Sequence, residues 1–231
     1  SKLNLKMIDN IDKPALSALW PNKKGMSVVL DLGANIECNS KNLFDFSIMG
    51  ASLYTSLYPN IKPNIALLNI GSEELKGSEI IKETYQILNE KKSSSYDFAG
   101  YIEGNHLMDG EVNVIVSDGF TGNVALKTAE GTSKFLTDSL KESLQENLLS
   151  KFSLLFSYFS LKKFKSKLDP RKYNGAIFLG LNGPVVKSHG GTDSTGFYYS
   201  IDLCYRIVKG NLMYQIKNNL SHLRNEKHQK N

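Results

Sequence analysis

The sequence has 231 residues, of which 41% are hydrophobic and 22% charged, with 18 glycines and 6 prolines. This composition excludes a disordered or collagen-like chain, and the length is enough to bury a sizeable core without disulfides or a metal. Cys38 and Cys204 have no CxxC partner, so neither a zinc ribbon nor a secreted disulfide framework is predicted, and a reducing cytoplasm is expected.

Charge is divided unevenly along the chain. Residues 1–140 carry 13 Lys/Arg and 17 Asp/Glu, whereas residues 141–231 carry 15 and 6. A basic end indicates a partner with negative charge, namely nucleic acid, an anionic membrane surface or an acidic protein. The apolar stretches fall short of the roughly 20 residues that a bilayer-spanning helix needs, so we do not expect an integral membrane protein.

The predicted elements alternate between strands and helices. Residues 1–24 lack an apolar period and contain Pro14 and Pro21, so an irregular leading segment is expected. Strands are predicted at 26–31, 64–69, 97–101, 112–117, 176–179 and 185–188, and helices at 40–57, 73–90, from about 124 and from 194. The alternation predicts an α/β fold with a mainly parallel sheet and flanking helices, as a single domain over 1–231.

Two of the helices carry more specific expectations. In 40–57, Ser40 suits the N-cap, and Gly50 with Ala51 allows close packing. The last helix has an apolar stripe with spacings of 4, 3, 4 and 4, which predicts a buried face made of Phe197, Ile201, Cys204, Val208 and Leu212.

Four predicted strand ends lead into loops of glycine and small polar residues, at 31–35, 69–72, 118–123 and 187–194. In α/β folds ligands bind at the carboxyl ends of strands, and glycine loops at helix N-termini present N–H groups to an anion. For any one loop, glycine can instead simply close the strand while Ser or Asp caps the helix. Together the loops favour a phosphate-bearing ligand, with candidate binding residues Asp31, Gly33, Asn35, Asn69, Gly71, Asp118, Gly119, Thr121, Gly122, Asn123 and Gly190.

Lys187 and His189 are the candidate catalytic residues. They lie two apart, so in an extended chain they present a cation and a titratable imidazole on one face. The alternative is a surface lysine beside a hydrogen-bonded histidine. His106, His222 and His228 have no ligand-like spacing, so no metal site is predicted.

Residues 146–172 combine large apolar side chains with basic ones. Such a segment suits a bilayer interface, where lysines reach headgroups and phenylalanines insert below them. The candidate membrane contacts are Phe152, Phe156, Phe159, Lys162 and Lys163. A buried helical hairpin or a dimer contact is the alternative, and nucleic-acid binding is disfavoured because the aromatic residues cluster as a block.

Several motifs follow one another in order along nearly the whole chain, at Ile11–Ala15, Leu30–Asn35, Leu68–Gly77, Gly104, Ser117–Lys127, Asn174–Ala176, Gly180–Lys187 and His189-Gly190. The most specific of them is Asp118-Gly-Phe-Thr-Gly-Asn123. Together these motifs resemble the PlsX family, the bacterial acyl-ACP:phosphate acyltransferases.

The resemblance implies an enzyme of phospholipid biosynthesis that makes acyl phosphate from acyl carrier protein thioester and inorganic phosphate. It also implies a fold similar to isocitrate and isopropylmalate dehydrogenases with a protruding helical segment, a homodimer, and peripheral membrane association in the cytoplasm. No cofactor is implied, because phosphopantetheine arrives on the carrier protein. The family's glycine-rich Asp-Ala-Met-Gly-Gly-Asp and Ala-Gly-Asn-Thr-Gly loops do not occur in this sequence, so an N-terminally truncated fragment is expected.

The implied reaction agrees with the residues. Phosphate is already a nucleophile at neutral pH, so the protein must hold it against the thioester and stabilise the oxyanion, which glycine loops and a lysine can do. An acidic carrier suits the basic end. Two alternatives stay open: a non-catalytic membrane-associated scaffold, and a nicotinamide-dependent decarboxylating dehydrogenase, for which the arginines are few (Arg171, Arg206 and Arg224).

Overall fold

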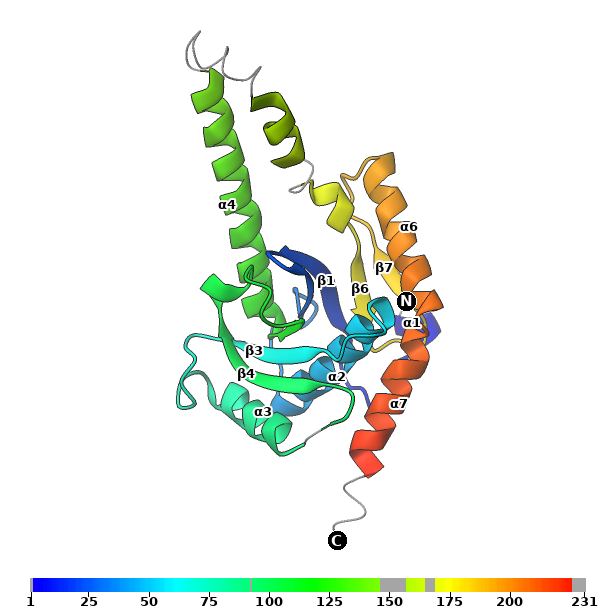
Figure 1. Ribbon diagram of the computed structural model, residues 1–231. Helices are drawn as coiled ribbons and strands as arrows, with labels where there is room; N and C mark the ends of the chain where they lie inside the picture. Colours follow the sequence, from blue (N-terminus) through cyan, green and yellow to red (C-terminus); the bar gives the residue numbers. More distant parts are fainter. Residues whose placement is uncertain (1, 92, 146–156, 165–168, 226–231) are drawn as a thin grey trace.

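The computed structural model describes residues 2–91, 93–145, 157–164 and 169–225 (Figure 1). The strands are β1 (Ala15–Asn22), β2 (Gly25–Leu30), β3 (Asn64–Asn69), β4 (Asp97–Glu103), β5 (Val114–Val116), β6 (Ala176–Leu179) and β7 (Val185–Lys187). The helices are α1 (Lys2–Leu5), α2 (Ser40–Leu57), α3 (Glu79–Glu90), α4 (Gly119–Gln145), α6 (Ser194–Lys209) and α7 (Leu212–Asn225), with short 3-10 turns η1 (Gly104–His106) and η2 (Pro170–Tyr173). Residues 157–164 are also helical.

The described strands form one seven-stranded sheet in the order β4-β3-β5-β2-β1-β6-β7. Strands β4, β3, β5 and β2 are parallel neighbours. Strand β1 is antiparallel to both of its neighbours, and β7 is antiparallel to β6. The predicted α/β fold with a mainly parallel sheet is therefore confirmed, with β1 and β7 running against the other five strands.

One face of the sheet is covered by α2, with α3, α6 and α7 packed around it (Figure 1). Almost all of α2 is buried, including the fully enclosed Phe46 and Leu53. A Cβ at Gly50 would lie 2.6 Å from Val114 Cγ1 and 2.7 Å from Leu30 Cδ1. The predicted close approach at Gly50 is thus confirmed, because the helix contacts β2 and β5 there without a side chain between them.

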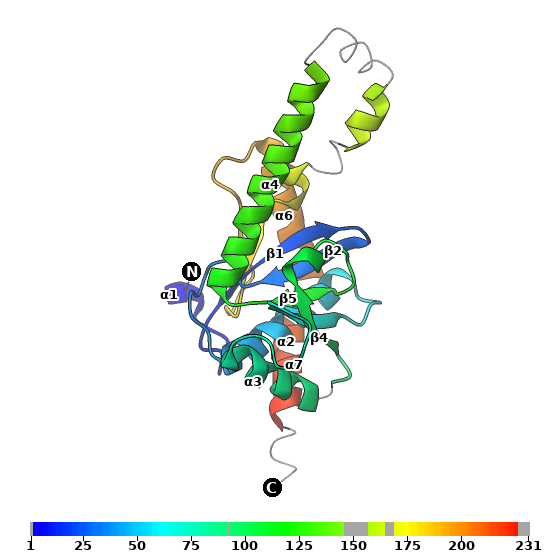
Figure 2. The ribbon, with the colours of Figure 1, turned by 90° about the vertical axis from the view of Figure 1, so that its left-hand side faces the viewer.

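The opposite face of the sheet carries a smaller apolar cluster, built around Trp20, Leu32 and Ile115. Only the first turns of α4 pack against this cluster, through Ala125, Leu126 and Ala129. The rest of α4 projects away from the sheet, with the helix 157–164 beside it in both views (Figures 1 and 2). None of the helices in the described part of the chain has the length and apolar content to cross a membrane.

The expectation of an irregular segment over 1–24 is wrong, because β1 lies in the middle of the sheet. It forms a hairpin with β2 in which Asn22 pairs with Gly25, and Gly25 has a φ of +146° that L side chains rarely adopt. Apolar runs separated by a short turn that ends in glycine predict such a hairpin. Pro14 and Pro21 are the reason that the sequence pattern predicts an irregular segment there and not a strand.

Three predicted helix starts are corrected by the structure. Asn39, not Ser40, caps α2, in a reciprocal capping box with Asn42. Helix α3 begins after the cap Ser78 rather than at Glu73, because Gly77 has a φ of +96° that ends the preceding loop. Helix α4 begins at Gly119, five residues before the predicted start.

The predicted buried stripe of the last helix is also wrong. Phe197, Ile201 and Val208 are 54%, 55% and 55% exposed. The buried face of α6 is instead made of Gly196, Ser200, Leu203 and Ile207. The helix ends at Gly210, where a Cβ would overlap the carbonyl of Ser56, and the buried Leu212 opens a second helix, α7.

Candidate functional site

Three of the four predicted loops lie along one edge of the sheet. Strands β2, β5 and β3 are parallel, so the loops 31–35, 118–123 and 69–72 all follow carboxyl ends at that edge. Strand β7 runs the other way, with Lys187 paired to Ala176 at the start of β6. The loop 187–194 therefore leaves toward the opposite edge and does not lie with the other three.

The Asp31 carboxylate organises the loop 31–35. Asp31 is completely buried, and its Oδ1 accepts from the backbone N–H groups of Leu16 and Ala34, both at 3.0 Å. Its Oδ2 accepts from the backbone N–H of Asn35 at 2.8 Å and from the Asn35 side-chain amide at 2.7 Å. Protein donors thus surround both oxygens, and Asp31 holds the loop rather than facing solvent.

The loops 31–35 and 118–123 interlock, and we call this pair the locked loops. Gly119 donates its backbone N–H to the carbonyl of Asn35 at 2.8 Å, and a Cβ there would lie 2.5 Å from that oxygen. A Cβ at Gly122 would overlap the carbonyl oxygen of Asp31. A Cβ at Gly33, which has a φ of +118°, would lie 3.5 Å from the Cβ of Asn123. Gly119 and Gly122 thus allow the two backbones to touch, and Gly33 leaves room for the Asn123 side chain.

Asp118 caps α4. Its Oδ1 accepts from the backbone N–H of Thr121 at 2.8 Å, and its Oδ2 accepts from the Thr121 hydroxyl at 2.9 Å. Because the N–H groups of Gly119, Thr121 and Gly122 all donate to protein acceptors, this helix start is largely satisfied by the chain itself. The Asn123 side chain is exposed beside it.

Asn69 closes the third loop of this edge. Its side-chain amide donates to the carbonyls of Gly71 and Lys76, each at 3.1 Å. The same side chain lies against Gly77, where any Cβ would overlap Asn69 Oδ1. The loop 69–77 is thus folded back on the end of β3.

The loop 187–194 is held by a residue that the sequence analysis did not assign to the site, Asn174. Its side-chain oxygen accepts from the backbone N–H of His189 at 3.1 Å, and its amide donates to the hydroxyls of Ser188 and Thr192, both at 2.9 Å. Lys187 and His189 are exposed. His189 Nδ1 accepts from the backbone N–H of Gly191 at 3.1 Å, which leaves Nε2 as the free ring nitrogen.

Arg171 joins two carboxylates beside this loop. It binds Asp169 through Nε and Nη2 at 2.9 and 2.6 Å, and Asp193 through Nη1 at 3.0 Å. Hydrogen bonds from Arg171 lower the pKa of Asp169 to about 2. The pKa of Asp193 is lowered first by the backbone N–H of Gly196, which it caps, and then by Arg171.

Two further groups lie at the locked loops, and the sequence analysis assigned neither to the site. The Lys13 ammonium donates to the carbonyl of Glu37 at 2.7 Å, which brings a cation to this edge. Cys38 is 7% exposed, and burial raises its pKa to about 11. Its thiol is therefore protonated at neutral pH and is a poor nucleophile. Their positions beside the locked loops depend on the folded chain, so the sequence alone could not predict them.

Some of the candidate membrane contacts can be placed. Phe159 is 81% exposed, and Lys162 and Lys163 are exposed on the same short helix, 157–164. This part of the segment is not a hairpin buried in the core. Phe152 and Phe156 lie outside the described residues.

Comparison with known proteins identifies the family. The family model described as fatty acid synthesis protein matches residues 1–215. The chain belongs to this family. The resemblance to PlsX proteins predicted from the motifs is thereby confirmed.

Its relatives include proteins named phosphate acyltransferase. That of Pelagibacter ubique is 67% identical over 220 residues, which are 95% of this chain and 66% of the relative. That of Paramagnetospirillum magneticum is 47% identical over 208 residues, 90% of this chain and 59% of the relative. This family member therefore spans about two thirds or less of the length of these relatives.

Solved structures share the fold. The EutD phosphotransacetylase of Staphylococcus aureus matches with a TM-score of 0.60 at 14% identity, over 90% of this chain and 58% of that one. A branched-chain phosphotransacylase of Enterococcus faecalis matches with a TM-score of 0.52 at 17% identity, over 84% and 66% of the two chains. At such identities the likeness concerns the architecture alone.

Proposed function

We propose that this chain provides the larger part of a phosphate acyltransferase, which converts an acyl carrier protein thioester and inorganic phosphate to acyl phosphate and free carrier thiol in phospholipid biosynthesis. The observation that carries the proposal is membership of the fatty acid synthesis protein family, with a phosphate acyltransferase as a relative at 67% identity. The phosphate acyltransferase names belong to the relatives, and their transfer to this chain is what an experiment must test.

The reaction is an acyl transfer without a covalent enzyme intermediate. A phosphate oxygen attacks the thioester carbonyl, a C–O bond forms, the C–S bond breaks, and the departing thiolate takes a proton. The protein has to hold the anion near the carbonyl and stabilise the developing oxyanion. The raised pKa of Cys38, about 11, supports direct transfer, since this cysteine at the locked loops is not a thiolate at neutral pH.

We assign phosphate binding to the edge that holds the locked loops and the Asn69 loop. Asp31, Asp118 and Asn69 act there as positioning residues, because their side chains bind backbone groups of their own loops. Asn35 is also a positioning residue, since its side-chain amide donates to the Pro14 carbonyl and to the Asp31 carboxylate. The glycines at 119 and 122 permit close backbone approach, and those at 33 and 71 leave room for neighbouring side chains. Both Thr121 and Asn123 are exposed, but the Thr121 hydroxyl already donates to Asp118, so the Asn123 amide is the group we propose to face an anion.

Lys187 and His189, with Gly190 next to them, form the second part of the proposal. An exposed lysine can neutralise charge on the phosphate or oxyanion. With Nδ1 accepting from Gly191, Nε2–H of His189 can hydrogen-bond the same centre, and the imidazolium form can donate a proton to the thiolate. Because β7 leads away from the locked loops, Lys187 and His189 lie toward the opposite edge of the sheet. We therefore propose them as an alternative centre for the reaction, not as groups that act on an anion held by the locked loops.

Partners follow from the same proposal. The donor is carried by an acyl carrier protein, which also brings the phosphopantetheine, so no separate cofactor is proposed. The exposed Phe159, Lys162 and Lys163 support reversible contact of the segment 146–172 with an anionic membrane surface, which implies a cytoplasmic enzyme at the membrane. We further propose a homodimer and an isocitrate/isopropylmalate dehydrogenase-like fold, for which the mixed α/β sheet is the support.

The test is direct detection of acyl phosphate by hydroxylamine trapping, with free thiol measured in parallel. It is run on this chain and on a fusion that joins to this chain the part of the Pelagibacter relative outside the matched 220 residues. Acyl phosphate from either protein supports the proposal. Its absence from both, with the fold intact by circular dichroism, contradicts it and favours a membrane-associated scaffold, whereas reduction of a nicotinamide would favour a dehydrogenase.

Variants of the active protein test the catalytic assignment. Lys187→Ala should lower turnover about a hundredfold, the effect of removing one oxyanion donor, with little change in stability. His189→Gln keeps a hydrogen-bonding side chain but cannot titrate near neutral pH. If both variants retain normal turnover, the pair is structural and the locked loops become the leading site.

A further inference from the structure

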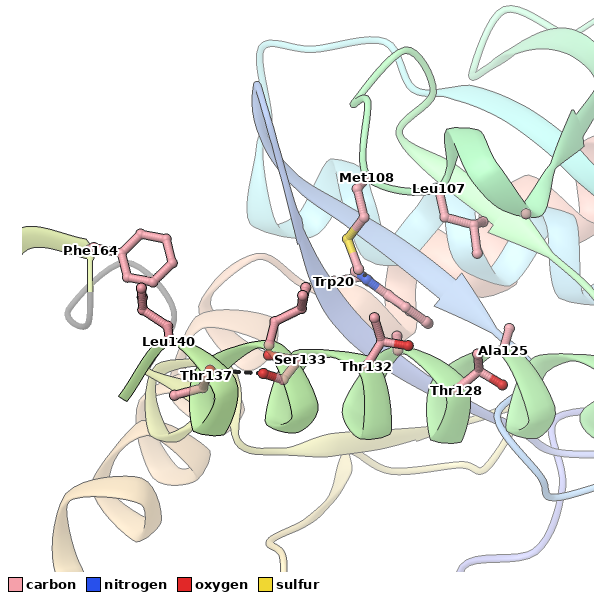
Figure 3. Close-up of a pocket in the computed structure, with 13 residues that line it drawn as sticks. Trp20, Leu107, Met108, Ala125, Thr128, Thr132, Ser133, Thr137, Leu140 and Phe164 are labelled. Atoms are coloured by element: carbon pink, nitrogen blue, oxygen red, sulfur yellow. Dashed lines mark hydrogen bonds between the residues drawn. The ribbon is translucent and has the colours of Figure 1, made fainter. Parts of the chain in front are cut away.

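A groove runs along α4 on the sheet face that the other helices leave uncovered. Its volume is about 760 Å³, within the range of small-molecule sites. Its apolar walls come from β1, from the chain after β4, from α4 and from the helix 157–164 (Figure 3). The large side chains are Trp20, Leu107, Met108, Leu136, Leu140 and Phe164.

The chemistry of the groove is that of a hydrocarbon site. None of the described residues that line it is charged. Its polar side chains are hydroxyls of α4, and that of Thr137 donates to the Ser133 carbonyl of the same helix at 2.8 Å, which removes a donor from the groove (Figure 3). Met108, Leu140 and Phe164 are 41%, 40% and 48% exposed. A phosphate or an acidic protein would find no cationic side chain among these lining residues, whereas an alkyl chain would cover their apolar surfaces.

The groove is continuous with the loop edge of the sheet. It reaches Ala125, one turn after Gly122, and Gly104, which directly follows the carboxyl end of β4. From Ala125 to Leu140 the helix rises roughly 22 Å, enough for the extended chain of a common fatty acid. A thioester carbonyl at the locked loops would therefore send its alkyl chain along α4.

We propose that this groove binds the fatty acyl chain of the donor, an inference that rests on the proposed acyl transfer. Each methylene that enters the groove is removed from water, so affinity depends on chain length. The expected change is about fourfold in Kd per methylene, the ratio that corresponds to about 0.8 kcal/mol. A second copy of the chain is the other apolar occupant that an experiment has to distinguish.

The only tryptophan of the sequence lies in the groove and reports on its occupancy. Trp20 is 5% exposed, and its indole N–H contacts the Met108 sulfur at 2.9 Å. Titration of the chain with dibrominated stearate should quench its fluorescence to a plateau, because bromine quenches an indole that it contacts. Plain stearate should restore the signal, and shorter saturated acids should compete more weakly by about fourfold per methylene.

Two serine variants on the same helix provide the control. Ser133→Glu places a carboxylate in the groove, whereas Ser143→Glu places the same group beyond it, and both serines are exposed. Ser133→Glu should raise the Kd for dibrominated stearate at least tenfold, since burying an unpaired charge is costly. Ser143→Glu should leave the Kd unchanged within a factor of two. Circular dichroism verifies that both variants fold.

The outcomes separate the possibilities. Absence of quenching overturns the proposal, and sedimentation velocity that shows a dimer would then assign the groove to a second copy. Quenching that both variants retain equally also overturns it, because the probe then binds elsewhere. Quenching is independent of turnover: a groove that binds alkyl chains in a protein without acyl phosphate formation would refute the proposed function alone, and the reverse result would refute the groove alone.

Discussion

Two loop regions of similar composition differ sharply in structure. The locked loops touch backbone to backbone, with Gly122 against the carbonyl of Asp31. The loop 187–194 is exposed, and a Cβ at Gly190 would meet no atom within 4 Å. Both are glycine-rich strand ends in the sequence, so composition alone does not distinguish a loop that supports the fold from one that is free to contact a ligand.

Alanine in place of glycine should separate the two regions most strongly. Gly122→Ala forces the start of α4 away from Asp31 and should lower the free energy of unfolding by about 3 kcal/mol or more. Gly190→Ala enters open space and should change it by less than about 0.5 kcal/mol. Urea unfolding measures both, and equal effects would remove the distinction between the regions.

The next comparison concerns the side chain that holds each region. Asp31→Asn retains the shape but cannot accept four hydrogen bonds, so buried N–H groups lose partners and stability should fall by about 2 kcal/mol. Asn174→Ala removes bonds from a loop that water can reach, and about 1 kcal/mol is expected. A larger loss for Asn174→Ala would contradict the ranking.

Thiol labelling compares the regions without mutation. Cys38, beside the locked loops, has its pKa raised from 9.0 to about 11, so at pH 8 its thiolate fraction is about a hundredfold below the ordinary value. Cys204, on helix α6, which follows the loop 187–194, is only half-buried. Iodoacetamide followed by peptide mass spectrometry should find Cys204 modified first. Prior modification of Cys38 in folded protein would show that the locked loops open readily.

The smallest effect is expected from the ion pairs of Arg171 beside the loop 187–194. The pKa of Asp169 is lowered to about 2, so its pairing with Arg171 stabilises the fold above pH 4 and is lost as pH falls from about 4 to 2. Because Arg171 is 48% exposed, solvent screens the pair and its contribution to stability is small. Asp169→Asn should slightly lower stability at pH 7 and flatten its pH dependence below 4, as followed by thermal unfolding.

Sequence reasoning located most elements because their signals are local. The strands at 64–69 and 176–179 and the helix 40–57 occur with the predicted bounds, and Gly50 is the predicted contact. The errors concern the direction of strand β7 and the face of helix α6 that is buried. The spacing of Phe197 and Ile201 fits a helical stripe, but only packing against α2 decides which stripe is buried, and it is that of Leu203 and Ile207.

The candidate site residues show the same difference between local signals, which the sequence carries, and long-range packing, which it does not. Glycine-rich strand ends were identified from the sequence, and three of the four lie on one edge. That β7 is reversed depends on its pairing with β6, which nothing local encodes. The contributions of Asn174, Lys13 and Cys38 depend on neighbours far along the chain and could not be predicted from spacing.

The position of β1 also bears on how the chain is synthesised. The partner β2 follows β1 directly in the chain, but the other partner, β6, is synthesised much later: the Ser17 hydroxyl bonds to the Ile177 carbonyl across 160 residues. During translation the free edge of β1 carries unpaired N–H and C=O groups, which are a template for association with other nascent chains. Completion of the sheet is therefore expected to be slow and to benefit from chaperones that shield this strand until the C-terminal part emerges.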